Sequence, residues 1–260
     1  MRPVIALLTD FGTVDHYAGA MKGVMLGICP EATLVDISHD IPAHDVTAGA
    51  LELAAAYKYF PSGTVFVAVV DPGVGSARRG LAADTGDYRF VAPDNGVLTL
   101  VLREAPPKKI VELTERRYAR PTVSRTFEGR DRFAPAAAWL AKGTLLPALG
   151  RPVSEIQRLD IPQPEATADA VTGVVLRVDR FGNLVTNIDR KSVERLGGTI
   201  AIDAGGHRVD RLVATYAELS ADGVGALFGS TDHLELAAPS ASAAALLGLG
   251  RGAPVSVSRR

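Results

Sequence analysis

The stretch Thr64-Val65-Phe66-Val67-Ala68-Val69-Val70-Asp71-Pro72-Gly73-Val74-Gly75 decides the fold class of the first half of this chain. Its first seven residues form a largely apolar run, which is typical of a strand buried on both faces of a sheet. The run ends at a carboxylate, Asp71, and the proline and glycines after it turn the chain and let the backbone approach other groups closely. Ligands bind at such strand ends in open α/β sheets. The stretch therefore predicts a buried strand that leads into a site.

Strand and helix patterns alternate on both sides of this strand. Strand patterns cover residues 4–8, 33–37, 80–83 and 88–91, and helical patterns cover 18–28, 46–59 and the residues before Leu102. Asp45 is expected to cap the helix that begins at Val46. Because strands and helices alternate, residues 1–145 are predicted to form an α/β domain with a largely parallel sheet flanked by helices.

The pattern changes after residue 145. Prolines punctuate residues 146–168, which lack apolar periodicity and are predicted to form a linker. Beyond the linker, short strand patterns alternate with glycines and no long helix is indicated. These strands are expected at 171–178, 199–202, 208–212, 225–228 and 233–236. Residues 169–260 are therefore predicted to form a smaller all-β domain, either a barrel or a sandwich.

Composition limits the possible functions. The chain has 260 residues, of which 47% are hydrophobic, and carries 28 basic against 29 acidic residues without a basic stripe. Neither nucleic acid nor a membrane is therefore an expected partner. The N-terminus enters a strand without the features of a signal peptide, and no apolar run reaches membrane-spanning length. The single cysteine, Cys29, is expected in the core and fits a reducing cytoplasm, which is the predicted location.

Carboxylates follow two of the predicted strands. Arg78 and Arg79 come seven and eight residues after Asp71, so that loop offers a carboxylate and a guanidinium to one small volume. A purely structural turn in which Asp71 pairs with Arg78 is an equally open interpretation. After the first strand, Asp15 is expected to cap the next helix. Asp10 lies too early for capping and is well placed to accept the hydroxyls of a ribose.

The segment 36–45 contains two histidines, His39 and His44, and several aspartates. This composition suits a divalent metal, but the spacing matches no short ligand motif and Pro42 breaks any helix that would align the two imidazoles. A polar loop is the favoured interpretation, and no metal site is predicted.

Two further segments combine aromatic and polar residues. Charged residues at 128–132 are flanked by Phe127 and Phe133, which favours a pocket lining over a solvated helix start. Asn183 follows Phe181 closely, and an amide beside an aromatic ring suits an adenine base. A hairpin turn built on Gly182 and Asn183 explains the same residues and is favoured on local sequence alone.

Together and in this order, these segments resemble the S-adenosylmethionine (SAM) hydroxide adenosyltransferase and fluorinase family. The resemblance covers nearly the whole chain, and seven motifs in register make it specific. The motifs are Leu8-Thr9-Asp10-Phe11-Gly12, Ile28-Cys29-Pro30, Phe60-Pro61-Ser62-Gly63-Thr64-Val65, Asp71-Pro72-Gly73-Val74-Gly75, Ala92-Pro93-Asp94-Asn95-Gly96, Thr126-Phe127 with Gly129-Arg130-Asp131, and Phe181-Gly182-Asn183 with Thr186-Asn187.

The resemblance implies an enzyme that hydrolyses SAM to adenosine and L-methionine with no metal or organic cofactor. It also implies a homotrimer whose active sites lie where the first domain of one subunit meets the second domain of the next. The implied substrate-binding residues are Asp10 for the ribose hydroxyls with Asp15 nearby, Thr126 and Phe127 for the ribose and base, Phe181 and Tyr216 around adenine, Asn183 and Ser230 as hydrogen-bonding groups, and Asp179 for the methionine ammonium.

The family's hydrolase branch uses an Asp-Arg-His triad to position water. Asp71 and Arg78 match its first two members, whereas Glu128 stands where the family has histidine. Fluorinases have an aromatic residue at the position of Asp71, so halide transfer is not expected. Because of Glu128, a non-catalytic adenosine or SAM binder stays open as an alternative. A metal-dependent phosphohydrolase using residues 39–45 is a second one.

Overall fold

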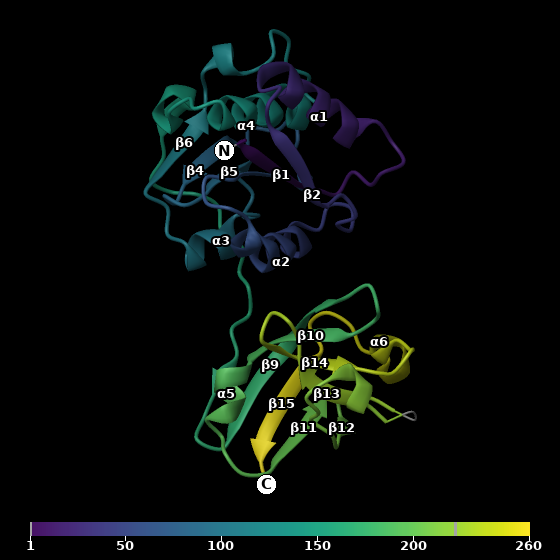
Figure 1. Cartoon of the computed structure of the whole chain (residues 1–260). Helices are drawn as coiled ribbons and strands as arrows, with labels where there is room; N and C mark the ends of the chain where they lie inside the picture. Colours follow the sequence, from purple (N-terminus) through teal and green to yellow (C-terminus); the bar gives the residue numbers. More distant parts are fainter. Residues whose placement is uncertain (1, 221–222) are drawn as a thin grey trace. The chain divides into compact units, whose positions relative to one another are not determined.

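A computed structural model describes residues 2–220 and 223–260. It divides the chain into two compact units, Met1–Asp160 and Ile161–Arg260, which are drawn in Figure 1. Each unit has its own sheet and its own buried core.

The N-terminal unit is built on a seven-stranded sheet with the order β2-β1-β3-β5-β4-β6-β7. Its strands are β1 (Val4–Thr9), β2 (Thr33–Ser38), β3 (Val65–Val69), β4 (Gly80–Asp84), β5 (Arg89–Pro93), β6 (Lys109–Leu113) and β7 (Gly150–Pro152). β1 pairs in parallel with β2 and β3, and β3 pairs in parallel with β5. All pairings among β4, β5, β6 and β7 are antiparallel.

The prediction of a largely parallel sheet is therefore only partly correct, since the sheet is mixed. The reason lies in the short connection from β4 to β5, where Gly86 has a φ of 102°. A tight turn can join only antiparallel strands, whereas parallel strands need a long crossover. Strands β6 and β7, which the sequence patterns did not reveal, extend the antiparallel half.

Helices cover both faces of this sheet. Figure 1 shows α1 (Tyr17–Ile28) and α4 (Ala134–Ala141) on one face, and α2 (Val46–Ala56) and α3 (Thr99–Glu104) on the other. Short helical turns η1 (Tyr57–Tyr59), η2 (Arg116–Tyr118) and η4 (Leu146–Leu149) and a π-helix, η3 (Gly129–Phe133), complete the unit. No helix in the described ranges combines the length and the apolar character needed to cross a membrane.

The two predicted helix caps have different outcomes. Asp45 accepts a hydrogen bond from the backbone N–H of Ala48 at 2.9 Å, so the predicted cap of α2 is confirmed. Helix α1 begins at Tyr17 and has His16 at its capping position. Asp15 lies one residue too early, so its predicted role as a cap is wrong.

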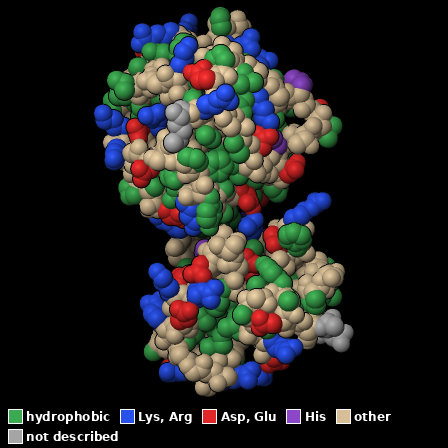
Figure 2. Space-filling view, in the orientation of Figure 1, with side chains coloured by type: hydrophobic (Ala, Val, Ile, Leu, Met, Phe, Trp, Pro, Cys, Tyr) green, Lys and Arg blue, Asp and Glu red, His purple; other side chains and the backbone are tan. Residues whose placement is uncertain are grey.

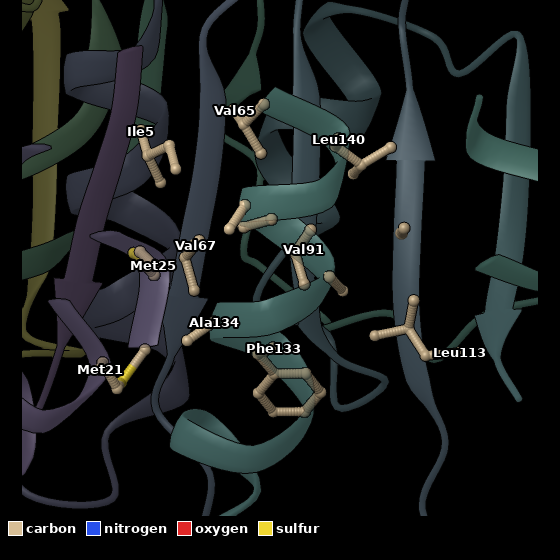
Figure 3. Packing of buried hydrophobic residues seen from close by; sticks show 14 of the residues in the cluster. Ile5, Met21, Met25, Val65, Val67, Val91, Leu113, Phe133, Ala134 and Leu140 are labelled. Carbon is tan, nitrogen blue, oxygen red and sulfur yellow. The ribbon is translucent and has the colours of Figure 1, made fainter. Parts of the chain in front are cut away.

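One buried cluster of the N-terminal unit lies between the sheet and the helices α1 and α4. Figure 3 shows Met21 and Met25 of α1 and Phe133 and Leu140 near α4 packed against strand residues such as Val67. Cys29 is fully buried in the same cluster, as expected. The alanines of α4 are also buried, because small side chains let this helix approach the sheet closely.

The C-terminal unit is the predicted all-β domain. Its strands are β8 (Glu165–Ala166), β9 (Ala170–Val178), β10 (Leu184–Asp189), β11 (Ile200–Ala204), β12 (His207–Val209), β13 (Gly225–Phe228), β14 (His233–Ala237) and β15 (Pro254–Arg259), with the short helices α5 (Arg190–Glu194) and α6 (Ala243–Leu247) and the turn η5 (Tyr216–Glu218). All pairings between these strands are antiparallel, in the order β12-β11-β15-β9-β10-β14-β13. The backbone just after β12 bonds to Ala226 of β13, which brings the two ends of this order together into a near-barrel.

The division between the units lies between Asp160 and Ile161, inside the predicted linker of residues 146–168. The structure assigns the first part of that linker to the N-terminal unit, because η4 and β7 occupy residues 146–152 and β7 pairs with β6. Leu146 and Leu149 are buried in the core and hold this segment there. At the other end, β8 pairs with β9 in the C-terminal unit.

Candidate active site

A buried ion-pair network lies just beyond the end of β3. Arg78 donates from Nε to Asp71 Oδ1 at 2.9 Å and also pairs with Asp71 Oδ2. Its Nη2 lies 2.6 Å from Glu128 Oε2. The side chains of Asp71, Arg78 and Glu128 are only 5%, 9% and 12% exposed. One guanidinium therefore bridges two carboxylates out of contact with most solvent.

The surroundings keep Arg78 charged. Burial by itself lowers the pKa of this guanidinium, but hydrogen bonding to Asp71 and the charges of Asp71 and Glu128 outweigh burial and raise its pKa above the usual range. The ring of Phe133 lies 5.2 Å from the guanidinium carbon and supports it from one side. A second guanidinium, that of Arg132, lies 3.6 Å from Glu128 Oε1, so two arginines face the two carboxylates.

The local sequence explains why the Asp71 loop closes against the Glu128 segment. Gly75 has a φ of 80°, and a Cβ atom there would lie 2.5 Å from the backbone oxygen of Arg125. Only glycine allows this close approach without strain. Asn95 donates from Nδ2 to the backbone oxygen of Val70 at 2.8 Å, which fixes the end of the strand.

The two arginines of this loop have separate partners. Arg79 donates from Nε to Asp94 at 2.9 Å, and Asp94 also accepts from the backbone N–H of Gln157 at 2.8 Å. Arg78 alone turns toward Asp71. By sequence alone either arginine could have belonged to the site. In the structure Arg79 instead binds Asp94, which also binds the backbone at Gln157.

A cavity of about 310 Å³ adjoins the network. Its lining brings together the N-terminal residues that the sequence predicted, apart from Arg78 and Asp15. The lining includes Asp10, Asp71, Thr126, Phe127 and Glu128. Phe127 is buried, and its ring packs edge-on against Phe11 and Tyr17, with centroids 5.9 and 5.1 Å away. These aromatic rings give the cavity an apolar wall opposite its carboxylates.

Asp10 is held by the loop that precedes α2. Its Oδ2 accepts a hydrogen bond from the backbone N–H of His44 at 2.9 Å, and His44 has a positive φ of 66°. His44 and Tyr17 also line the cavity and were not predicted as site residues. The signal for His44 was present in the polar segment 36–45, which was interpreted as a loop. Asp15 lies on the exposed loop before α1 and is not among the residues that line this cavity.

His39 stabilises the start of this loop through contacts of its ring and its backbone. It is 5% exposed, its Nδ1 lies 2.8 Å from Thr9 Oγ1, and its Nε2 lies 3.0 Å from Asp36. The backbone oxygen of His39 also accepts from Gly12 at 2.7 Å. Within residues 2–220 and 223–260, no group of three or more His, Cys, Asp or Glu side chains is arranged to hold a metal ion.

The C-terminal unit has a separate pocket of about 1000 Å³. Its lining contains every site residue predicted for this unit, namely Asp179, Phe181, Asn183, Tyr216 and Ser230. Phe181 is 77% exposed and Tyr216 is 50% exposed, so much of both side chains is uncovered. Uncovered aromatic rings at a pocket are suited to stacking on a flat ligand.

Asp179 shapes the turn that carries Phe181 and Asn183. Its Oδ1 accepts from the backbone N–H groups of both residues at 2.9 Å, and its Oδ2 accepts from Asn183 Nδ2 at 3.0 Å. Gly182 has a φ of 84°, and a Cβ there would collide with Ser242. The hairpin-turn interpretation of this segment is therefore confirmed, and the turn forms part of the pocket wall. Contact of Phe181 and Asn183 with an adenine base stays a prediction.

Glu235 is a pocket residue that sequence reasoning missed. It is 6% exposed and accepts a hydrogen bond from the Tyr216 hydroxyl at 2.7 Å. Burial, then this hydrogen bond and the charges of Glu235 and Asp179, raise the pKa of Tyr216 above its usual range, so the phenol stays a donor. A carboxylate between two leucines in a buried strand was the available signal, since an unpaired charge is costly there.

Comparisons with known proteins agree with this architecture. The family model for the SAM hydroxide adenosyltransferase N-terminal domain matches residues 5–150, and the model for the C-terminal domain matches residues 173–256. A relative from Thermus thermophilus named (R)-S-adenosyl-L-methionine hydrolase is 40% identical over 98% of this chain and 99% of its own length. A protein named fluorinase from an Actinoplanes species is 34% identical over 75% of this chain and 74% of its own.

A solved structure is similar over the whole fold. The crystal structure of an uncharacterized conserved protein from Thermotoga maritima matches with a TM-score of 0.93 and 32% sequence identity. The match covers 98% of this chain and 100% of that one.

Proposed function

Because the chain belongs to the SAM hydroxide adenosyltransferase family, we propose that it hydrolyses SAM to adenosine and L-methionine. The observation that carries this proposal is the buried bridge from Arg78 to Asp71 and Glu128 beside the N-terminal cavity. The name of the Thermus thermophilus relative, (R)-S-adenosyl-L-methionine hydrolase, supports it.

The reaction needs position more than acid catalysis. The oxygen of water bonds to C5′ of the adenosyl group, the C5′–S bond breaks, and its electron pair stays on sulfur. Methionine therefore leaves as a neutral thioether and needs no proton. Placing the water in line with that bond lowers the barrier by several kcal/mol, on the order of 7 or more in well-oriented systems. This step calls for no metal or organic cofactor, and we propose that the enzyme uses none.

Asp71 is the proposed group that orients the water and accepts its proton. Arg78 holds both carboxylate oxygens of Asp71, so the direction of the carboxylate is fixed before substrate binds. A fixed carboxylate loses little entropy in the transition state, which is the advantage of preorganisation.

Glu128 is proposed to share the work of Asp71. It stands where the family resemblance implies a histidine, and it contacts Arg78. A carboxylate beside the reacting carbon favours a substrate that carries a positive sulfonium.

The remaining predicted residues are proposed to bind the substrate. Asp10, Thr126 and Phe127 would contact the ribose and base side of the N-terminal cavity, with Asp15 nearby. The C-terminal residues are proposed to hold adenine between Phe181 and Tyr216, to hydrogen-bond through Asn183 and Ser230, and to bind the methionine ammonium at Asp179. Asp179 Oδ2 accepts one hydrogen bond from Asn183 and has a further lone pair for this purpose.

We further propose a homotrimer in which one substrate is bound by the first unit of one subunit and the second unit of the next. Light scattering combined with activity measurements tests this assembly, because a fully active monomer would contradict a shared site. A cytoplasmic location stays a prediction from the sequence.

The hydrolysis itself is tested by incubating the protein with SAM in ¹⁸O-labelled water and identifying the products by chromatography and mass spectrometry. We expect unlabelled methionine and adenosine that carries the label at its 5′ hydroxyl. A chelator in a parallel reaction should change nothing. Saturable SAM binding without products would instead identify a non-catalytic binder, and chelator-sensitive turnover would contradict the metal-free mechanism.

A further inference from the structure

The N-terminal unit has a second and larger cavity, of about 650 Å³, which lies along the segment from β6 to η3. Four arginines line it, namely Arg116, Arg117, Arg120 and Arg132. Of the described residues in its lining, Glu115 alone is acidic. Its volume is typical of small-molecule sites. Figure 2 shows Lys and Arg side chains at many places on this unit. Four of its arginines line this one cavity.

The positive charge of this arginine pocket is poorly compensated. Arg120 lies 3.5 Å from Asp131, but Asp131 binds Arg130 more closely, at 2.7 and 2.8 Å. Over the described ranges of the chain, no carboxylate pairs with Arg116 or Arg117, and Arg117 only packs on the ring of a neighbouring tyrosine at 4.8 Å. Guanidinium groups that line one cavity repel one another where no carboxylate offsets their charge, as at Arg116 and Arg117 among the described residues, and an anionic ligand would relieve that repulsion.

Arg132 connects this pocket to the candidate active site. It lines the arginine pocket, and its Nη1 lies 3.6 Å from Glu128 Oε1. Glu128 has a nearer partner in Arg78, at 2.6 Å. The Arg132 side chain is 36% exposed, so a dissolved ligand can reach it. If a bound anion drew the Arg132 guanidinium into the pocket, Arg78 would remain as the partner of Glu128.

We propose that the arginine pocket binds a chain of two or more phosphates, either free polyphosphate or the phosphate chain of a nucleotide, and that binding lowers turnover through Arg132. Guanidinium groups match phosphate oxygens in pairs of parallel hydrogen bonds, and several phosphates can engage several arginines at once. When Arg132 moves away from Glu128, the ion pair between Glu128 and Arg78 becomes stronger. The hydrogen bonds from Arg78 to Asp71 then become weaker. This regulatory half of the inference rests on the proposed function, whereas the binding half does not.

Binding is tested first, without substrate. Isothermal titration with sodium tripolyphosphate, ATP and orthophosphate at about 0.15 M ionic strength keeps nonspecific charge effects small. We expect saturable binding of tripolyphosphate, weakened about tenfold for each arginine removed in Arg116→Gln and in the double variant with Arg117→Gln. Arg103→Gln changes an exposed arginine on α3 outside the pocket and should bind like the wild type. Equal affinities for tripolyphosphate and ATP would identify the phosphate chain as the recognised group, and tighter binding of ATP would identify a nucleotide.

Regulation is then tested by measuring SAM turnover with and without saturating tripolyphosphate at matched ionic strength. We expect kcat to fall about fivefold in the wild type and to be unaffected by tripolyphosphate in Arg132→Gln. The same loss of kcat in both proteins would overturn the role of Arg132.

No saturable binding of any phosphate compound, or equal binding by the double variant, would overturn the site. A double variant whose oligomeric state changes, together with a wild type that binds no anion, would show that a partner subunit covers these arginines. If SAM is not hydrolysed at all but tripolyphosphate binds as expected, the proposed function fails and the site stands.

Discussion

The two pockets hold their polar side chains in different ways. In the N-terminal cavity, charged side chains bind one another, as Arg78 binds Asp71 and Glu128, and all three are nearly buried. In the C-terminal pocket, Asp179 binds backbone N–H groups, and the aromatic rings beside it are largely exposed. Buried, paired charges can act on reacting atoms, whereas exposed rings provide contact area for a ligand. The contrast predicts that substitutions of the paired charges in the first pocket change kcat and that substitutions of the exposed rings in the second change KM.

The largest effect is expected from Asp71→Asn. The amide keeps the shape of the carboxylate but cannot accept the proton of water, so kcat should fall about 10²- to 10⁴-fold while SAM still binds. Product chromatography and equilibrium binding measure the two quantities separately. Asp94→Asn is the matched control, because it alters the other buried arginine pair of this loop, which lies outside the cavity. Near wild-type release of adenosine by Asp71→Asn would remove Asp71 from the mechanism.

Phe181→Ala tests the C-terminal pocket, where a change in KM is expected. Loss of a stacking ring costs about 1–3 kcal/mol per base, so KM should rise roughly tenfold or more with little change in kcat. Folding should be unaffected because Phe181 is 77% exposed. Leu246→Ala removes another exposed apolar side chain of the same unit, outside the pocket, and serves as the control in steady-state kinetics. A fall in kcat with unchanged KM would break the proposed division of roles.

Glu128→His and Glu128→Ala sharpen the comparison within the first pocket. Histidine is the residue that the family resemblance leads us to expect at this position, and it removes one negative charge beside Asp71. We expect turnover to be retained or raised severalfold. An imidazole ordinarily titrates near pH 6.5 and a glutamic acid near pH 4.3, so the acidic limb of the pH profile should move to higher pH. Identical rates and profiles for wild type, Glu128→His and Glu128→Ala would show that Glu128 only forms a structural ion pair.

The smallest effect is expected from Tyr216→Phe, which removes the hydroxyl that binds Glu235. The C-terminal unit should lose about 1 kcal/mol of stability, because Glu235 stays buried without this donor and the phenol is half exposed. The raised pKa of Tyr216 fixes the pH range: the contribution is complete below the ordinary tyrosine pKa of about 10 and is lost as pH rises through the higher folded-state value. Thermal unfolding of both proteins at pH 7 and above pH 10 measures this. A difference that does not shrink at high pH would contradict the assignment, and Tyr59→Phe controls for an exposed phenol.

Local sequence determined the elements whose signals lie within a few residues of one another. The apolar run before Asp71 is strand β3, Asp45 caps α2, and the short strand patterns of the second half form an all-β unit. Motif order along the chain was enough to indicate the family, to which the matched family models assign the chain. These features depend on the order and spacing of residues along the chain, so they can be inferred from the sequence itself.

Only the tertiary structure decided the partners that the sequence left open. Pairing of Asp71 with Arg78 was one interpretation of the loop, whereas only the fold gives Arg79 its partner, Asp94. It also places Glu128 against Arg78, although fifty residues separate them in the chain. Such pairings follow from distances in space and from the cost of burying an unpaired charge, and neither is written in local sequence. For the same reason Glu235 was missed, since its burial is set by neighbours that the chain reaches only after folding.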